Sequence, residues 1–71
     1  MVIKVTTTQE GFQYRIAVIA DGKLKKVFRT SPDKVVNDRN RETDYWSGLP
    51  EVTEVVGNPI PPILTQKGGV R

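Results

Sequence analysis

The chain has 71 residues with no cysteine and no histidine, and 11 Lys and Arg against 8 Asp and Glu give a formal net charge of +3. This length allows one small domain, and without cysteine no disulfide can cross-link it. The lack of histidine removes the commonest general base and metal ligand, so we expect no enzymatic activity, no metal and no cofactor.

The charged residues are distributed unevenly along the chain. Residues 1–29 carry six basic and two acidic side chains, residues 30–56 carry three basic and six acidic ones, and residues 57–71 carry two basic ones. No stretch has the length and apolarity of a membrane span or of a signal peptide. We therefore expect a cytoplasmic protein that makes no membrane contact.

The first part of the chain predicts three antiparallel strands. Residues 2–8 are rich in β-branched side chains, residues 12–20 alternate in polarity, and residues 23–29 follow the turn signal Asp21-Gly22. In the second strand the apolar face consists of Phe12, Tyr14, Ile16, Val18 and Ala20.

The loop length of the second hairpin decides which side chains of residues 23–29 face the core, because a slip of one residue exchanges the two faces. A two-residue loop places several cations on the apolar face. A three-residue loop that begins at Ala20 and ends in a bulge pairs Val18 with Leu24 and Tyr14 with Phe28. We favour the three-residue loop because the apolar sets of the two strands then coincide.

The first hairpin has a similar ambiguity. A four-residue loop pairs Val5 with Tyr14 and keeps both Ile3 and Val5 in the core, whereas a three-residue loop moves Ile3 and Val5 to the other face. We favour the four-residue loop because it concentrates apolar area on one side of the sheet.

The favoured registers give the outer face of the sheet a mixture of cations and apolar side chains. Such a face is either a contact site or the far side of a core that something else covers. The partner-binding candidates on it are Arg15, Ile19, Lys23, Lys25, Val27 and Arg29.

Residues 30–50 predict a short helix. Ser31 followed by Pro32 is typical of a helix start, and we expect a helix near residues 32–40, followed by a polar loop or a frayed turn up to Gly48. Three further partner-binding candidates follow the start of this segment: Arg39, Arg41 and Trp46. The indole of Trp46 either covers the core or anchors an interface.

The end of the chain predicts a fourth strand over residues 51–56 and a flexible tail over residues 57–71, which is rich in Pro and Gly. Residues 60–64 are also compatible with a polyproline segment laid over the sheet or over a partner, and disorder is expected for residues 66–71. The fold class is therefore α+β: an antiparallel β-meander of three to four strands, one short helix and a disordered C-terminal tail. Residues 1–56 form its single domain.

Three functions are compatible with this layout. The first is a non-enzymatic regulator, monomeric when free, that binds a protein with an acidic surface. The second is a small nucleic-acid-binding module that uses the basic face of the sheet; this reading gains support if the alternative register places Tyr14 and Phe28 beside Lys25 and Arg29. The third is an accessory subunit of a larger assembly.

The chain resembles the small regulators that bacteriophages of the Xanthomonas phage type make to bind the host RNA polymerase. The resemblance lies in the size, in the charge layout and in the run from Met1 to Arg29 followed by a Pro-rich end. It implies a viral protein that docks on a large polymerase subunit in the host cytoplasm and regulates transcription, as an inhibitor of normal promoter use or termination.

Overall fold

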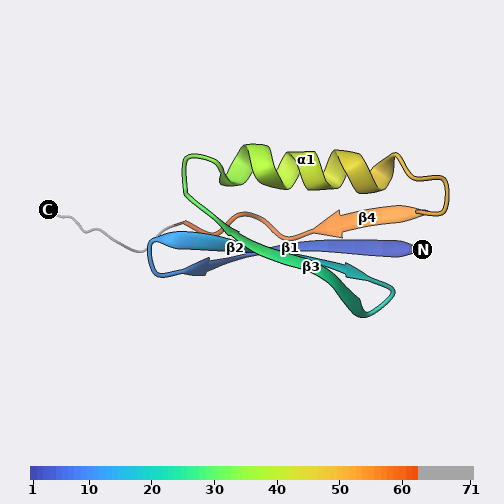
Figure 1. Cartoon of the computed structure of the whole chain (residues 1–71), viewed down its shortest axis with the longest axis horizontal. Coiled ribbons are helices and arrows are strands. Elements are labelled where there is room, and N and C mark those ends of the chain that lie inside the picture. Colours follow the sequence, from blue (N-terminus) through green and yellow to red (C-terminus); the bar gives the residue numbers. More distant parts are fainter. Residues whose placement is uncertain (63–71) are drawn as a thin grey trace, which may run out of the picture.

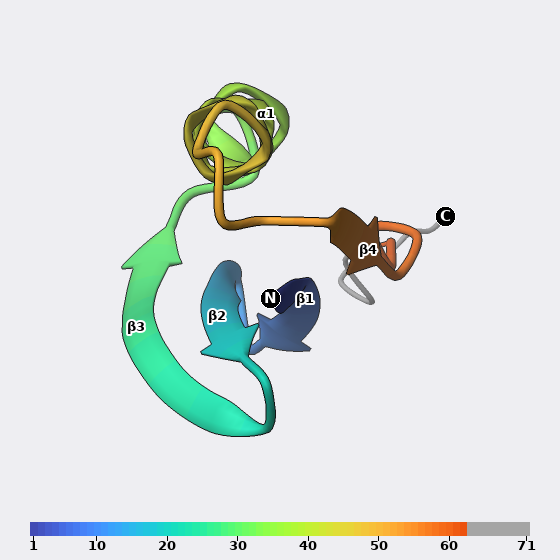
Figure 2. The same ribbon diagram turned by 90° about the vertical axis from the view of Figure 1, so that its right-hand side faces the viewer.

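Four strands and one helix make up the part of the chain that the computed structural model describes, residues 1–62. The strands are β1 (Val2–Glu10), β2 (Gln13–Ala20), β3 (Lys23–Thr30) and β4 (Glu54–Gly57), and the helix is α1 (Val35–Ser47), which lies on one face of the sheet (Figures 1 and 2). The expected small α+β fold is confirmed. Nowhere in residues 1–62 is a helix long and apolar enough to cross a membrane.

The strands lie in the order β3-β2-β1-β4. The first three form the expected antiparallel meander, but β4 runs parallel to β1, so the sheet is mixed rather than antiparallel throughout. The reason is the connection through α1, which carries the chain back across the sheet before β4 begins. The fourth strand starts at Glu54, later than expected, because residues 49–51 form the turn that follows α1.

The first hairpin has a two-residue loop that begins at Gly11, whose φ of 60° favours glycine. This loop pairs Val5 with Val18, so the four-residue loop and the pairing of Val5 with Tyr14 were wrong. The shift between the two registers is an even number of residues and leaves the faces unchanged.

Ile3 and Val5 accordingly lie in the core, as predicted. Phe12, by contrast, was expected in the core and is 74% exposed, because it belongs to the loop and not to the strand.

The second hairpin has a two-residue loop of Asp21 and Gly22, both with positive φ, followed by a bulge at Lys25. The expected three-residue loop was therefore wrong. Before the bulge Leu24 pairs with Ile19 on the outer face, and Leu24 is 59% exposed instead of buried.

Beyond the bulge the faces agree with the prediction. Phe28 pairs with Ile16 and packs against the core, and Val27 and Arg29 face outward. The two-residue loop shifts the pairing by one residue relative to the predicted register. The extra residue at Lys25 cancels this shift, so the side chains after it face the predicted sides of the sheet.

The core lies between the sheet and α1. Alternate residues of the strands supply it, as expected for a sheet that is covered on one face. Its buried apolar side chains are Ile3, Val5, Tyr14, Ile16, Val18, Ala20 and Val35.

Helix α1 begins at Val35, three residues later than expected. The Ser31 hydroxyl donates a hydrogen bond to the Asp33 carboxylate (2.6 Å), and the Lys34 amide donates to the Ser31 carbonyl (3.0 Å). Residues 31–34 are therefore a turn, and Ser31 is not the N-cap residue. Its hydroxyl also lowers the pKa of Asp33 below the ordinary value.

The helix continues without interruption to Ser47, although a polar loop or a frayed turn was expected after residue 40. Val35, Glu42 and Trp46 face the sheet at helical spacing and fix the helix along its whole length. Val36, outside this face of the helix, is 53% exposed.

Beyond β4 the chain remains attached to the sheet as far as Pro62. The Asn58 side chain accepts a hydrogen bond from the Thr7 amide (2.7 Å) and donates one to the Thr7 carbonyl (2.7 Å), and the Tyr14 hydroxyl donates to the Pro61 carbonyl. Ile60 packs against the core. Residues 60–62 thus follow the course over the sheet that was considered for residues 60–64. Residues 63–71, including those for which disorder was expected, lie outside the described residues.

Candidate docking surfaces around strand β3

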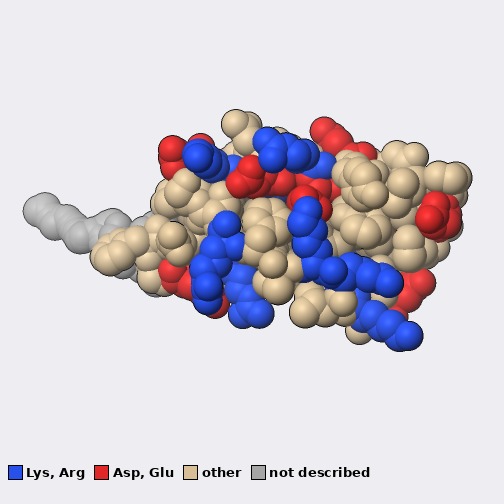
Figure 3. All heavy atoms as spheres, in the orientation of Figure 1, with Lys and Arg blue, Asp and Glu red and all other residues tan. Residues whose placement is uncertain are grey.

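The structure distributes the nine predicted binding residues over several places. The outer face of the sheet carries four of them: Arg15, Ile19, Val27 and Arg29. A hollow between β3 and α1 is lined by three more, Lys25, Arg41 and Trp46. Lys23 is the first residue of β3, and Arg39 reaches across to β4, beside Gly57. Lys and Arg side chains gather over β3, below the helix (Figure 3).

The outer face of the sheet, opposite α1, carries an apolar strip. We call this face the open face; its central residues are Arg15, Ala17, Ile19, Leu24, Val27 and Arg29. Ala17 lies opposite Val27, and Ile19 lies opposite Leu24, so the four side chains are neighbours across β2 and β3. Val27 is 43% exposed. Leu24 was not among the predicted site residues, because the assumed register turned it inward.

The two arginines of the open face share one carboxylate. Arg15 lies opposite Arg29, and Glu10 accepts ion pairs from Arg29 (3.0 Å) and Arg15 (3.4 Å). The hydrogen bond from Arg29 is the main reason that the pKa of Glu10 lies below its ordinary value, and the two positive charges add to the effect.

The predicted face with four cations is therefore not formed. Lys23 lies opposite Ala20, whose side chain belongs to the helix side of the sheet, and Lys25 occupies the bulge. Only Arg15 and Arg29 of the four remain on the open face.

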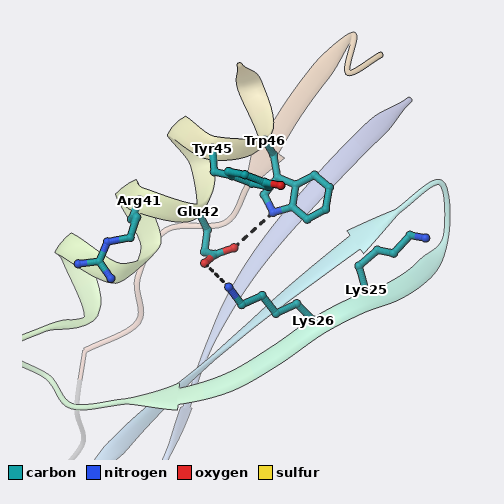
Figure 4. Close-up of a pocket in the computed structure, with 6 residues that line it drawn as sticks. All are labelled: Lys25, Lys26, Arg41, Glu42, Tyr45 and Trp46. Atoms are coloured by element: carbon teal, nitrogen blue, oxygen red, sulfur yellow. Dashed lines mark hydrogen bonds and ion pairs between the residues drawn. The ribbon is translucent and has the colours of Figure 1, made fainter. Parts of the chain in front are cut away.

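A hollow of about 530 Å³ separates the first half of β3 from the second half of α1 (Figure 4). We call it the groove; its lining residues are Lys25, Lys26, Arg41, Glu42, Tyr45 and Trp46. Three cations, two aromatic rings and one carboxylate thus line the groove, and Arg41 pairs with Asp38 (3.5 Å).

Glu42 holds the groove together. Its carboxylate is almost fully buried and forms an ion pair with Lys26 (2.7 Å) while it accepts a hydrogen bond from the Trp46 indole (3.3 Å). Lys26 also lies over the ring of Phe28, 5.2 Å from its centre. These contacts tie β3 to α1 through side chains.

The two aromatic rings of the groove have different surroundings. Tyr45 meets Trp46 edge to face, with ring centres 5.3 Å apart. Trp46 packs against the core, which accords with the covering role considered for it, whereas Tyr45 is 61% exposed. Tyr45 presents its ring to the groove although it was not among the predicted site residues.

Within residues 1–62 no cluster of Asp and Glu side chains is arranged to hold a metal ion. Comparisons of the chain with protein-family models, with curated proteins and with solved structures gave no significant match. The open face and the groove, which meet at β3, are therefore the candidate functional surfaces.

Proposed function

We propose that the protein is a non-enzymatic regulator that binds a partner protein through the open face. The observation that carries this proposal is the strip of Ala17, Ile19, Leu24 and Val27, which no described segment of the chain covers. Neighbouring exposed apolar side chains with a polar rim are typical of protein-binding sites.

The charges beside this strip favour an acidic partner. Arg15 and Arg29 lie at one end of it, and both side chains are about half exposed or more. Carboxylates of a partner can take the place of Glu10 on these guanidinium groups. Charges at such a rim speed and orient docking, while the apolar strip supplies the short-range contact.

A nucleic-acid module that uses the sheet face takes second place. Binding of single strands depends on exposed rings next to cations. On this sheet Tyr14 is buried and Phe28 faces the helix, so neither ring is on the open face.

The resemblance to phage regulators makes a bacterial RNA polymerase the first partner to test. In this proposal the protein acts in the host cytoplasm and alters transcription by occupying a polymerase surface.

Immobilised protein is used to capture partners from bacterial lysate, with and without nuclease, and is also presented with purified RNA polymerase. We expect one nuclease-resistant protein to be retained. Replacement of Leu24 by Ser removes apolar area from the open face and should reduce this retention severalfold.

The matched control is Val36→Ser, which removes a similarly exposed apolar side chain from α1. Retention by this control should equal that of the unaltered protein. Recovery of nuclease-sensitive material alone, or equal losses for Leu24→Ser and Val36→Ser, would refute the proposal.

A further inference from the structure

Strand β3 forms one edge of the sheet. Seven of its eight residues pair with β2, all on one side, and Lys25 is the unpaired bulge residue. Among the described residues no backbone hydrogen bond reaches the outer edge of β3. Such an edge is a template on which another extended chain can pair.

The helix leaves this edge accessible. Helix α1 packs mainly against β1 and β4, and β3 curves around the side of the sheet (Figure 2). Only side chains bridge the space between β3 and α1, through Lys26 with Glu42 and Thr30 with Asp38. A strand added beside β3 would therefore border both the groove and the open face.

The side chains around β3 define what such a strand should look like. Because successive residues of a strand point to opposite faces, half of its side chains would turn toward the groove and half would continue the open face. The groove offers the exposed ring of Tyr45 with Lys25 and Arg41, and the open face offers Leu24 and Val27. Acidic side chains therefore suit the groove, and apolar side chains suit the open face.

The charge of β3 selects among possible strands. Four of its eight residues are cations, namely Lys23, Lys25, Lys26 and Arg29, and none is acidic. Lysines on an edge strand protect it against pairing with a second copy, because like charges face each other across the new ladder. The same charges favour an acidic strand.

We propose that β3 receives an extended acidic segment of the partner protein as a fifth strand of the sheet, with apolar residues at alternate positions. This inference rests on the proposed function and specifies the partner's chemistry. A second copy of this chain and a single-stranded nucleic acid are the competing occupants that the test must separate.

The test uses the full chain labelled with ¹⁵N and an eight-residue peptide of alternating Glu and Val, which matches β3 in length. We expect the amides of β3 and those around Tyr45 to shift, the β3 amides to gain protection from exchange, and backbone contacts between the peptide and β3 to appear. A peptide of alternating Lys and Val and a single-stranded oligothymidylate should leave β3 unchanged.

The variant Lys25→Glu should weaken the acidic peptide's binding roughly fivefold to tenfold, because an attraction becomes a repulsion. Lys25 makes no ion pair with the described residues, so the fold should tolerate this change. The matched control Lys34→Glu alters the net charge equally at the start of α1 and should leave the affinity unchanged.

Several outcomes would overturn the inference: no peptide binding, shifts confined to β1 and the first hairpin, binding of the oligonucleotide instead, or β3 signals that change with protein concentration alone. If Leu24→Ser abolishes retention of the partner protein but the β3 amides gain no protection with the peptide, the inference is refuted and the proposed function stands. Retention that Leu24→Ser does not alter would refute the proposed function, whatever the peptide does.

Discussion

At the scale of single residues, two carboxylates occupy opposite environments. Glu42 is buried between the sheet and α1, where it binds Lys26 and Trp46. Glu10 lies on the open face and binds Arg15 and Arg29. The first carboxylate contributes to the cohesion of the fold, and the second sets the charge that the open face presents to a partner.

Replacement of Glu42 by Ala should lower the free energy of unfolding by about 1–2 kcal/mol. The main cause is the half-buried indole N–H of Trp46, which loses its acceptor. The ion pair contributes less, because Lys26 is half exposed. Urea unfolding followed by fluorescence of Trp46 measures the change. The control is Asp44→Ala, an exposed carboxylate of the same helix, which should have little effect. Equal losses for the two variants would contradict this role of Glu42.

The replacement Arg29→Gln should raise the pKa of Glu10 toward its ordinary value, because the hydrogen bond from Arg29 is the largest cause of the lowered pKa. A carboxyl group with a depressed pKa in the folded state stabilises the fold above its unfolded pKa, and this contribution disappears as the pH falls through the folded pKa. NMR titration of the Glu10 carboxyl carbon measures the shift. Lys4→Gln removes an equal charge from the same sheet face and should change the pKa little.

At the scale of elements, the two hairpins show what local sequence can specify. The three strands and the place of the second turn were predictable, because alternation and the Asp21-Gly22 signal act over a few residues. The pairing registers were not predictable, because each register changes when a loop gains or loses a single residue. The bulge at Lys25 explains why Val27 and Arg29 were placed on the correct face while Leu24 was not.

Strand β4 depends on a close approach to its neighbour at Gly57. A Cβ atom at this position would lie 2.9 Å from the Val5 carbonyl oxygen and 3.1 Å from a guanidinium nitrogen of Arg39. Gly57→Ala should therefore destabilise the fold by about 1–3 kcal/mol. Gly48→Ala is the control, because its Cβ would meet ordinary contacts of 3.5 Å and more. Thermal unfolding compares the two; equal midpoints would show that β4 tolerates the extra atom.

At the scale of the whole molecule, the segment after β4 closes the fold. The side chain of Asn58 forms hydrogen bonds with the backbone amide and carbonyl of Thr7, which lies 51 positions earlier in the chain. The carbonyl of Pro61 accepts a hydrogen bond from the hydroxyl of the buried Tyr14. The N-terminal and C-terminal parts of the described chain are therefore held side by side on one edge of the sheet.

The variant Asn58→Ala leaves the Thr7 amide and carbonyl without partners and should cost about 1–3 kcal/mol of stability. Hydrogen exchange should rise at the Thr7 amide in particular, which distinguishes a local opening from a general loss of stability. Asn40→Ala removes an exposed amide from α1 and serves as the control. Unchanged exchange at Thr7 in Asn58→Ala would contradict the bridging role of Asn58.

The sequence by itself determined the α+β class, the three antiparallel strands, the core face of Ile16 and the opposite face of Arg15 and Ile19, because these follow from patterns that repeat along a short stretch of chain. Tertiary structure alone decided the length of α1, the parallel partner of β4 and the division of the cations between the open face and the groove. Each of these depends on contacts between residues far apart in the chain: Glu42 with Lys26 holds the helix to β3, and β4 finds β1 only after the chain has crossed the sheet.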